Sequence, residues 1–311
     1  MRFSETCTGL RKNRGEKFTP IVVYLRTEYA TIINRQSRSP QCLRVTLSNE
    51  QINEYERDGV ICLRSVFEPA WLEQLAVGVG KNFAAPGPYH TVYTAKDNPG
   101  GFYDDYCNWS RIGEYEDFIS NSCAGEIAGR MMRSTTARIY HEHVLVKEPG
   151  TREPTPWHHD LPYYGVDGNQ LCSIWLPLDP VPQSVCPEFI AGSHSEGKMY
   201  YPRFFLTSEN YANDISGFET MPDVDAKRDS LNIKTWDLQL GDCIVFHMRT
   251  LHGAPSTEGL KQRRRAFSTR WIGDDAVFAN RAWKTSPPYP EVDLQPGDAM
   301  EHDSFPLVWS R

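Results

Sequence analysis

The sequence has 311 residues, a formal net charge of -7 and a pI near 5.7, and 40% of its residues are hydrophobic. This balance is typical of a globular protein, and no apolar run reaches the roughly 18 residues that a membrane-spanning helix needs. Because phosphate binding requires a concentrated basic surface, the acidic balance argues against nucleic acid as a partner and leaves a small molecule as the expected ligand.

The first part of the sequence differs in charge from the rest. Residues 1–44 contain nine Lys or Arg residues and three acidic residues. Organelle transit segments are rich in arginine and poor in acids, so one interpretation is a targeting signal. The other is a disordered tail, or a start codon placed too early. We therefore expect a basic N-terminal extension at residues 1–46 and a single domain at residues 47–311.

The cysteines predict reduced, packed thiols rather than a disulfide scaffold. They are scattered without a CxxC pair or the framework of a small disulfide-rich domain. This pattern favours an intracellular, cytoplasmic setting, unless the extension directs the chain to an organelle. The eight positions are Cys7, Cys42, Cys62, Cys107, Cys123, Cys172, Cys186 and Cys243.

Helical signals come first in the predicted domain. Ser48, followed three residues later by Gln51, forms a capping box, which predicts a short helix that Gly59 ends. The stretch 87–109 is rich in Gly, Pro, Tyr and Asn and is expected to form loops. The other expected elements are a strand at Val60–Leu63, a helix at about Pro69–Asn82 and a helix at Cys123–Met132 after the cap Ser122.

From about residue 137 the pattern changes to short β-type runs broken by Pro, Gly and Asp, which predicts a sandwich or barrel. The segment 195–234 interrupts this series with polar residues and clustered aromatic residues, and we expect an insertion or lid there. The predicted strands are His143–Lys147, Pro156–Tyr164, Cys172–Leu178, Glu188–Ile190, Ile233–Leu238, Cys243–Phe246 and Arg264–Trp271.

Three side chains in the β-rich region predict a metal site. His158 and Asp160 are two residues apart, so both leave the same face of a strand. His252 follows about ninety residues later, where a neighbouring strand of the same barrel is expected. Two imidazoles and one carboxylate on one side of a metal leave adjacent positions open, which is the arrangement of non-haem Fe(II) oxygenases.

A cation is also required if the co-substrate is 2-oxoglutarate, because its far carboxylate would be buried. Arg264 supplies that cation in this interpretation, twelve residues after His252. Strand alternation puts Arg264, Ala266, Ser268 and Arg270 on one face and turns Arg263 and Arg265 outward.

The ordered set of motifs resembles the phytanoyl-CoA dioxygenase family. The resemblance covers roughly residues 47–283 and implies a mainly β fold with flanking helices, built on a double-stranded β-helix (jelly-roll, cupin-like) core at about 137–272. The segments that carry it are Leu145–Thr151, Trp157–Tyr163, Ser173–Pro180, Gly192–His194, His252–Pro255 and Arg264–Ala266.

The resemblance also implies roles for single residues. His158, Asp160 and His252 would bind iron, and Arg264 would hold the distal carboxylate of 2-oxoglutarate. Trp175 matches a family tryptophan beside the co-substrate, although a plain core aromatic residue is the equal alternative.

Two further positions are weaker matches to the family. Lys147 would support the co-substrate or the charge balance of the pocket, or else be a plain surface lysine. Ala254 departs from relatives that have a serine there, so that contact would come from Ser268 or Ser256.

Other histidines and aromatic residues have simpler interpretations. His159, His194 and His247 are expected to be structural, and His141 and His143 either line the pocket or pack within the fold. The aromatic residues before the barrel either shape the pocket or pack helices on the sheet: Tyr89, Tyr93, Phe102, Tyr103, Tyr106 and Trp109.

The resemblance implies an Fe(II)- and 2-oxoglutarate-dependent dioxygenase that uses dioxygen, hydroxylates an unactivated carbon of a small organic substrate, and releases succinate and CO2. The carboxylate of Asp160 argues against halogenation, because related halogenases have a small residue there. The alternatives are a cupin-like metal enzyme that does not use 2-oxoglutarate and a catalytically silent metal- or small-molecule-binding protein.

Overall fold

The computed structural model describes residues 45–94 and 100–311. Almost all of the predicted basic extension therefore lies outside the described residues, as do Cys7 and Cys42. Within the described residues no helix is long and apolar enough to cross a membrane.

Among the described residues the first helix is α2 (Asn49–Asp58), which begins at the predicted capping box. The Ser48 hydroxyl accepts a hydrogen bond from the Gln51 amide at 3.2 Å, and the Gln51 side chain accepts one from the Ser48 amide at 2.9 Å. Gly59 ends the helix with φ 71°, a left-handed conformation that glycine adopts without strain.

Three more α-helices follow in the described part of the chain. The predicted helix at 69–82 is α3 (Pro69–Ala84). The sequence pattern missed α4 (Gly113–Asn121). The helix predicted after a Ser122 cap is α5 (Ala124–Met131), but Ser122 instead ends α4 and Cys123 occupies the N-cap position.

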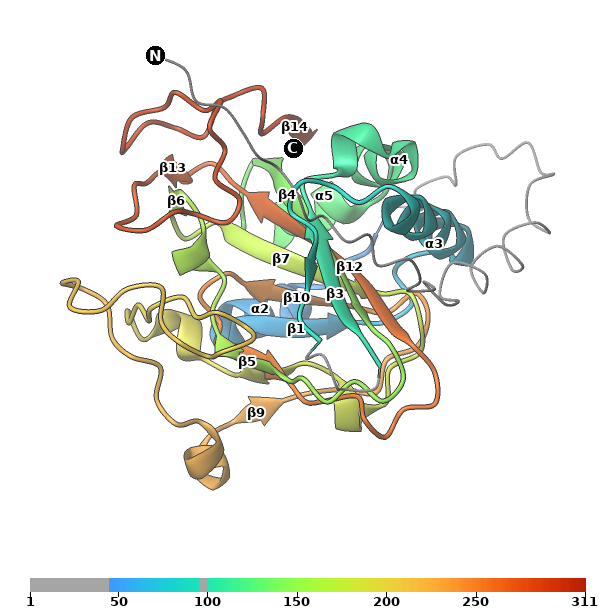
Figure 1. Cartoon of the computed structure of the whole chain (residues 1–311). Helices are drawn as coiled ribbons and strands as arrows, with labels where there is room; N and C mark the ends of the chain where they lie inside the picture. The colour runs from blue at the N-terminus through green and yellow to red at the C-terminus, as the bar shows by residue number, and fades with distance from the viewer. Residues whose placement is uncertain (1–44, 95–99) are drawn as a thin grey trace, which may run out of the picture. The chain divides into compact units, whose positions relative to one another are not determined.

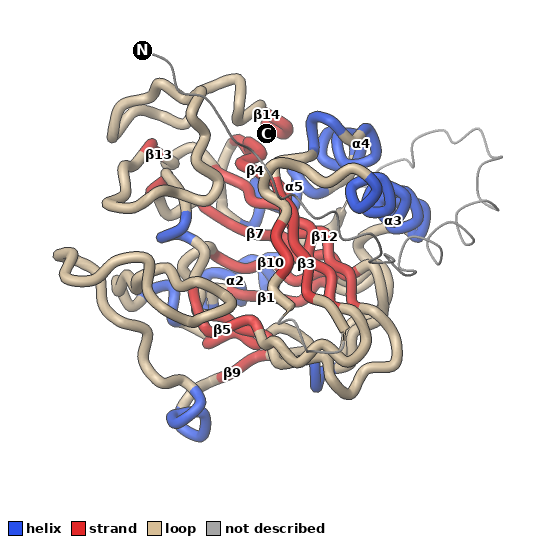
Figure 2. Tube along the Cα trace, viewed as in Figure 1, coloured by secondary structure: helices blue, strands red, loops and turns tan. Residues whose placement is uncertain are grey.

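The strands form a large antiparallel sheet and a smaller one, the two sheets of a jelly roll (Figures 1 and 2). In spatial order the large sheet contains β1 (Val60–Leu63), β10 (Cys243–His247), β7 (Leu171–Pro177), β12 (Arg264–Ile272), β4 (Thr136–Lys147), β3 (Phe102–Tyr106) and β2 (Thr91–Val92), and β14 (Leu307–Ser310) also pairs with β4. The small sheet contains β5 (Thr155–His158), β11 (His252–Ala254), β8 (Glu188–Ile190) and β9 (Ile233–Lys234). Outside the two sheets, β6 (Val166–Asp167) pairs with β13 (Val277–Phe278).

The short 3-10 helices lie between these strands. They are η2 (Trp109–Arg111), η3 (Leu161–Tyr163), η4 (Gln183–Val185), η5 (Ser193–Ser195) and η6 (Asp225–Ser230). The mainly β jelly-roll fold that the sequence predicted is confirmed.

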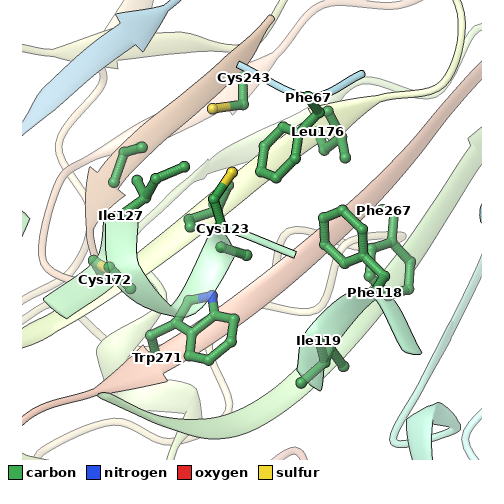
Figure 3. Close-up of a cluster of buried hydrophobic side chains, with 14 of the residues drawn as sticks. Phe67, Phe118, Ile119, Cys123, Ile127, Cys172, Leu176, Cys243, Phe267 and Trp271 are labelled. Carbon is green, nitrogen blue, oxygen red and sulfur yellow. The ribbon is translucent and has the colours of Figure 1, made fainter. Parts of the chain in front are cut away.

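The helices cover the outer face of the large sheet, where α3 and α4 lie on the side away from β5 and β9 (Figure 1). Phe267 of β12 packs against the rings of Tyr115 and Phe118 of α4, with centroids 4.6 and 5.6 Å apart. Figure 3 shows Phe267 and Trp271 of one strand in this cluster together with Cys123, Cys172 and Cys243. The six cysteines among the described residues form no disulfides, which agrees with the prediction of reduced, packed thiols.

The inner face of the large sheet carries the alternate residues and faces the small sheet. Trp175, Phe246 and Ala266 pack there with Phe189 of β8. Because β12 buries Phe267 outward, the predicted inward face with Arg264 and Arg270 is confirmed. This alternation gives the interior a partly polar lining.

Two local predictions were wrong in ways that matter for the site. The stretch 87–109 contains β2 and β3 rather than loops alone, because β3 pairs along the whole of its length with β4. The strand predicted at 156–164 ends at His158, after which the chain turns into η3. Asp160 consequently has helical backbone angles, φ -68° and ψ -39°.

The predicted lid or insertion, 195–234, consists mostly of loops with short bridges and η6 (Figure 2). Arg203, Phe204, Phe205 and Tyr211 from this segment line the central cavity described below. Its action as a lid stays a prediction.

The outer core yields a stability test. Replacing Phe267 by Ala removes a fully buried ring, so the free energy of unfolding is expected to fall by roughly 3–5 kcal/mol. Leu307→Ala, at a side chain that is 49% exposed, should change it by less than about 0.5 kcal/mol. Urea unfolding followed by circular dichroism measures both, and equal effects would show that Phe267 is not a core residue.

Candidate active site

A cavity of about 300 Å³ lies between the two sheets. Strands β4, β7 and β12 of the large sheet and β5 and β11 of the small sheet contribute to its lining, together with the 195–234 segment. The volume is in the range of small-ligand pockets, and the lining combines aromatic rings with a few polar side chains, which is the usual chemistry of such sites.

Two of the predicted metal ligands meet across a strand pair. His252 of β11 lies directly opposite His158 of β5, and their ring centroids are 4.2 Å apart. Gly253 allows this close pairing, because a Cβ there would lie 3.2 Å from both the Thr155 carbonyl oxygen and the Trp157 ring.

Both imidazoles are oriented by their own backbone. His158 Nδ1 lies 2.8 Å from the Pro156 carbonyl oxygen, and His252 Nδ1 lies 2.9 Å from the Thr250 carbonyl oxygen. Since a carbonyl only accepts, each Nδ1 carries the proton and each Nε2 offers a lone pair. This is the orientation that metal-binding histidines commonly have.

Asp160 reaches the same point from a turn rather than from the strand. Its Oδ1 lies 3.7 Å from the Nε2 atoms of both His158 and His252. The turn is held because the next amide, that of Leu161, donates to the Met248 carbonyl at 2.9 Å. The three side chains therefore converge as predicted. However, Asp160 lies beyond the end of the strand, so strand alternation is not what brings it there.

Buried groups compensate the charge of Asp160, which is 3% exposed. Burial by itself raises the pKa of this carboxyl, but Arg270, together with the Ser173 hydroxyl, holds it below its ordinary value. The Ser173 hydroxyl donates to Oδ2 at 2.9 Å, and Arg270 Nε lies 3.5 Å from the same oxygen. Asp160 is therefore ionised, and its Oδ1 remains directed at the two histidines.

The two imidazoles are neutral at ordinary pH. Burial and the neighbouring His252 lower the pKa of His158 to about 3, and burial also lowers the pKa of His252 although Asp160 opposes the shift. Within the described part of the chain, the ligand atoms of these three side chains lie within 4.8 Å of one another, and no other His, Cys, Asp or Glu group there comes together in this way.

Arg264 lines the same cavity and is almost fully buried. Burial lowers the pKa of its guanidinium to about 10, so it stays charged at neutral pH. Its Nη1 donates to the Val185 carbonyl, and no carboxylate of residues 45–94 or 100–311 forms an ion pair with it. In contrast, Arg263 pairs with Glu148 and Arg265 with Asp179, away from the cavity.

The other predicted co-substrate residues occupy different surroundings. Trp175 lines the cavity, as does Ala254. Ser268 lies between Trp175 and His143 across the sheet, and its hydroxyl is buried without a hydrogen-bond partner among the described residues, but it does not line the cavity. Their contacts with a co-substrate stay predictions.

Lys147 is not the surface lysine that one interpretation gave. It is 1% exposed, its Nζ donates to the Glu153 carbonyl at 2.8 Å, and it lies 4.6 Å from the centre of the Phe102 ring. Burial, with the nearby charge of Arg264, lowers its pKa well below the usual range. It lies outside the cavity lining.

Three histidines are structural, as predicted. His159 accepts from the Tyr200 amide at 3.0 Å, on the side of the chain away from the cavity. His247 accepts from the Arg249 amide at 3.0 Å, and the ring of His194 packs against it.

The remaining histidines and aromatic residues divide into those that line the cavity and those that pack elsewhere. His141, His143, Tyr93 and Tyr106 line the cavity. The others pack elsewhere: Tyr89 stacks on Tyr106, Phe102 lies under Tyr93 and Lys147, Tyr103 contacts Phe83 of α3, and Trp109 packs on the outer core.

Sequence reasoning gave no role to two charged residues of the cavity. Arg270 was placed on the inner face of β12 by alternation, but its partner Asp160 is 110 residues away, and no local signal links them. Asp104 was missed because the stretch that contains β3 was expected to form loops. The signal that was available is the alternation of Phe102, Asp104 and Tyr106 along a single strand face.

Solved structures share this fold. A non-haem alpha-ketoglutarate-dependent carbocyclase, SnoK from nogalamycin biosynthesis, is 20% identical, with a TM-score of 0.67 over 85% of this chain and 97% of its own. The epimerase SnoN, solved with Fe3+, alpha-ketoglutarate and nogalamycin RO, is 19% identical, with a TM-score of 0.65 over 84% and 98%. EctD from S. alaskensis, solved with 2-oxoglutarate and 5-hydroxyectoine, is 14% identical, with a TM-score of 0.60 over 84% and 88%.

No curated protein matches the sequence. A family model does: the model of phytanoyl-CoA dioxygenase matches residues 55–266, which is more than half of the chain and includes the three converging side chains and Arg264. The chain therefore belongs to the phytanoyl-CoA dioxygenase family.

Proposed function

We propose that this protein is an Fe(II)- and 2-oxoglutarate-dependent oxygenase that hydroxylates an unactivated carbon of a small organic substrate. The observation that carries the proposal is the convergence of His158, Asp160 and His252 in the cavity between the two sheets. Two neutral imidazoles and an ionised carboxylate are the ligand set of non-haem Fe(II) oxygenases. Three protein ligands would leave further coordination positions of a bound ion available to co-substrate and dioxygen.

The surrounding residues fit the iron site. Arg270 and Ser173 hold Asp160 Oδ2, which keeps Oδ1 directed at the two Nε2 atoms. When bound, iron supplies the activation of dioxygen, coupled to oxidative decarboxylation of 2-oxoglutarate to succinate and CO2. The chain itself holds the ligands, encloses the reacting groups and excludes water.

Arg264 is the proposed anchor of the co-substrate. It is a buried cation without a carboxylate partner among the described residues, and it lines the cavity that contains the iron ligands. A planar guanidinium binds a carboxylate through two parallel hydrogen bonds, and a buried charge needs such a partner. Trp175 would pack beside the co-substrate.

Hydroxylation is the simplest outcome for this site, but members of the same fold include a carbocyclase and an epimerase. The product mass separates the three: a hydroxylase adds one oxygen atom, a cyclase that removes two hydrogens lowers the mass, and an epimerase leaves it unchanged. Halogenation is disfavoured because Asp160 occupies the ligand position that a halide would need.

The first test is anaerobic titration of Fe(II) into the apoprotein with and without 2-oxoglutarate. We expect a weak visible charge-transfer band from the chelated keto acid, which His252→Ala abolishes because one ligand is lost. His302→Ala, at a histidine that does not line the cavity, should keep the band. Iron binding without a band would favour the cupin-like alternative, and absence of iron binding would refute the metal site.

A second test concerns Arg264. Arg264→Gln removes the cation. The 2-oxoglutarate concentration for half-maximal succinate formation should therefore rise roughly 10- to 100-fold, which corresponds to the loss of a charge-assisted hydrogen bond. Arg263→Gln is the matched control, because that neighbour pairs with Glu148 outside the cavity. Equal behaviour of the two variants would exclude Arg264 as the anchor.

Arg270 is proposed as a positioning residue for Asp160. Arg270→Met leaves this carboxylate without its cation, so iron affinity should fall roughly 10- to 100-fold, and Arg270→Lys should recover part of the loss. Ser173→Ala, which removes one hydrogen bond to the same oxygen, should have a smaller effect. Calorimetric iron titration of the folded variants measures this. Unchanged affinity in Arg270→Met would show that Arg270 does not position the ligand.

A further inference from the structure

Asp104 is a buried acidic residue on the wall of the cavity, apart from the proposed iron ligands. It lies on the inner face of β3, paired across the strands with Thr91 and Leu145, which line the cavity as well. Its side chain is 3% exposed. The neighbouring Asp105 points the other way, toward Asn82 of α3.

The two oxygens of Asp104 differ in their partners. Oδ2 accepts from the Tyr93 hydroxyl and lies against His143 Nε2, both at 2.9 Å. Oδ1 is buried and has no hydrogen-bond partner among the described residues. Besides the His143 contact, no Lys or Arg side chain of the described residues pairs with this carboxylate. A buried carboxylate oxygen without a donor is costly and requires an explanation.

A second unpartnered acceptor belongs to His141, which lines the same cavity and lies opposite Arg270 on the neighbouring strand. His141 Nδ1 lies 3.1 Å from the Glu142 carbonyl oxygen, so it carries the proton, and Nε2 is buried without a partner among the described residues. Burial lowers the pKa of His141 well below its usual range, which leaves Nε2 as a lone pair. Asp104 and His141 thus both present acceptors, and a ligand that satisfies them must present donors.

Aromatic rings surround this end of the cavity. Tyr106 contacts His141 and His143, with ring centroids 6.0 and 5.4 Å apart. On the other side, Tyr93 contacts Phe205 at 5.8 Å, and Phe205 contacts the proposed iron ligand His158 at 4.9 Å. The rings of Phe205 and Tyr93 therefore lie between the proposed iron ligand His158 and Asp104. Aromatic faces beside a carboxylate form a favourable environment for an organic cation.

We propose that the substrate of this enzyme carries a protonated amino group, which donates to Asp104 Oδ1 while the apolar body of the substrate lies among the rings between Asp104 and His158. This inference rests on the proposed function, because it assigns the cavity to the substrate. A cation is favoured over a neutral donor because the carboxylate lacks a Lys or Arg partner among the described residues. Asp104 then selects the substrate and fixes which carbon faces the iron.

The test uses the full-length protein under anaerobic conditions with Fe(II) and 2-oxoglutarate. Calorimetric titration compares probes of equal shape, 2-phenylethylamine with 2-phenylethanol and tryptamine with tryptophol. We expect the amine of each pair to bind roughly 10-fold tighter or more, because a charge-assisted hydrogen bond replaces a neutral one. If no amine binds more tightly than its alcohol, the proposal is wrong.

The matched variant is Asp104→Asn, which has the same shape and can still accept from Tyr93 and His143. It should weaken amine binding roughly 10- to 100-fold while alcohol binding changes little. Glu148→Gln, at a partly exposed carboxylate that pairs with Arg263, is the control and should change neither. If amine binding is unchanged in Asp104→Asn, Asp104 does not bind the amine, and its role is limited to the hydrogen bond with His143.

The keto-acid band separates this proposal from the proposed function. A band in the wild-type protein and in Asp104→Asn, without amine preference, refutes the amine site alone. Loss of the band in the wild-type protein refutes the oxygenase itself, whatever the probes do.

Discussion

The buried charge of Asp160 is the constraint on which the rest of the site depends. A carboxylate at this depth stays ionised only if nearby groups compensate it, and Arg270 and Ser173 do so from β12 and β7. That compensation occupies one carboxylate oxygen and leaves the other between the Nε2 atoms of His158 and His252. The two sheets must therefore pack correctly before any metal site exists.

Side chains in the large sheet alternate between a face that packs against the helices and a face that lines the cavity. On β12 the residues that face the helices, such as Phe267, are apolar and build the core, while Arg264 and Arg270 face inward. The fold is thus stabilised on one side of the sheet and functional on the other. Substitutions on the outer face are expected to change stability, whereas substitutions on the inner face are expected to change binding.

The cavity lining contains both cations and acceptors without partners. Arg270 lies beside Asp160, and Arg264 has no acidic partner among the described residues. Asp104 Oδ1, an acceptor without a partner among the described residues, is separated from His158 by the rings of Tyr93 and Phe205. An anionic co-substrate and a cationic substrate would therefore occupy different parts of one pocket. The co-substrate would pair with Arg264, and the substrate would donate to Asp104 Oδ1.

The sequence by itself determined the capping box at Ser48, most of the strands, the family and the three residues proposed as metal ligands, because these depend on local spacing and on motifs that keep their order. Tertiary structure alone decided that Asp160 reaches the site from a turn. It alone paired Arg270 with that carboxylate and buried Lys147. It also turned Asp104 toward the cavity. Strand periodicity predicts which face a side chain takes, but the partner on that face comes from a distant segment, and only packing brings the two together.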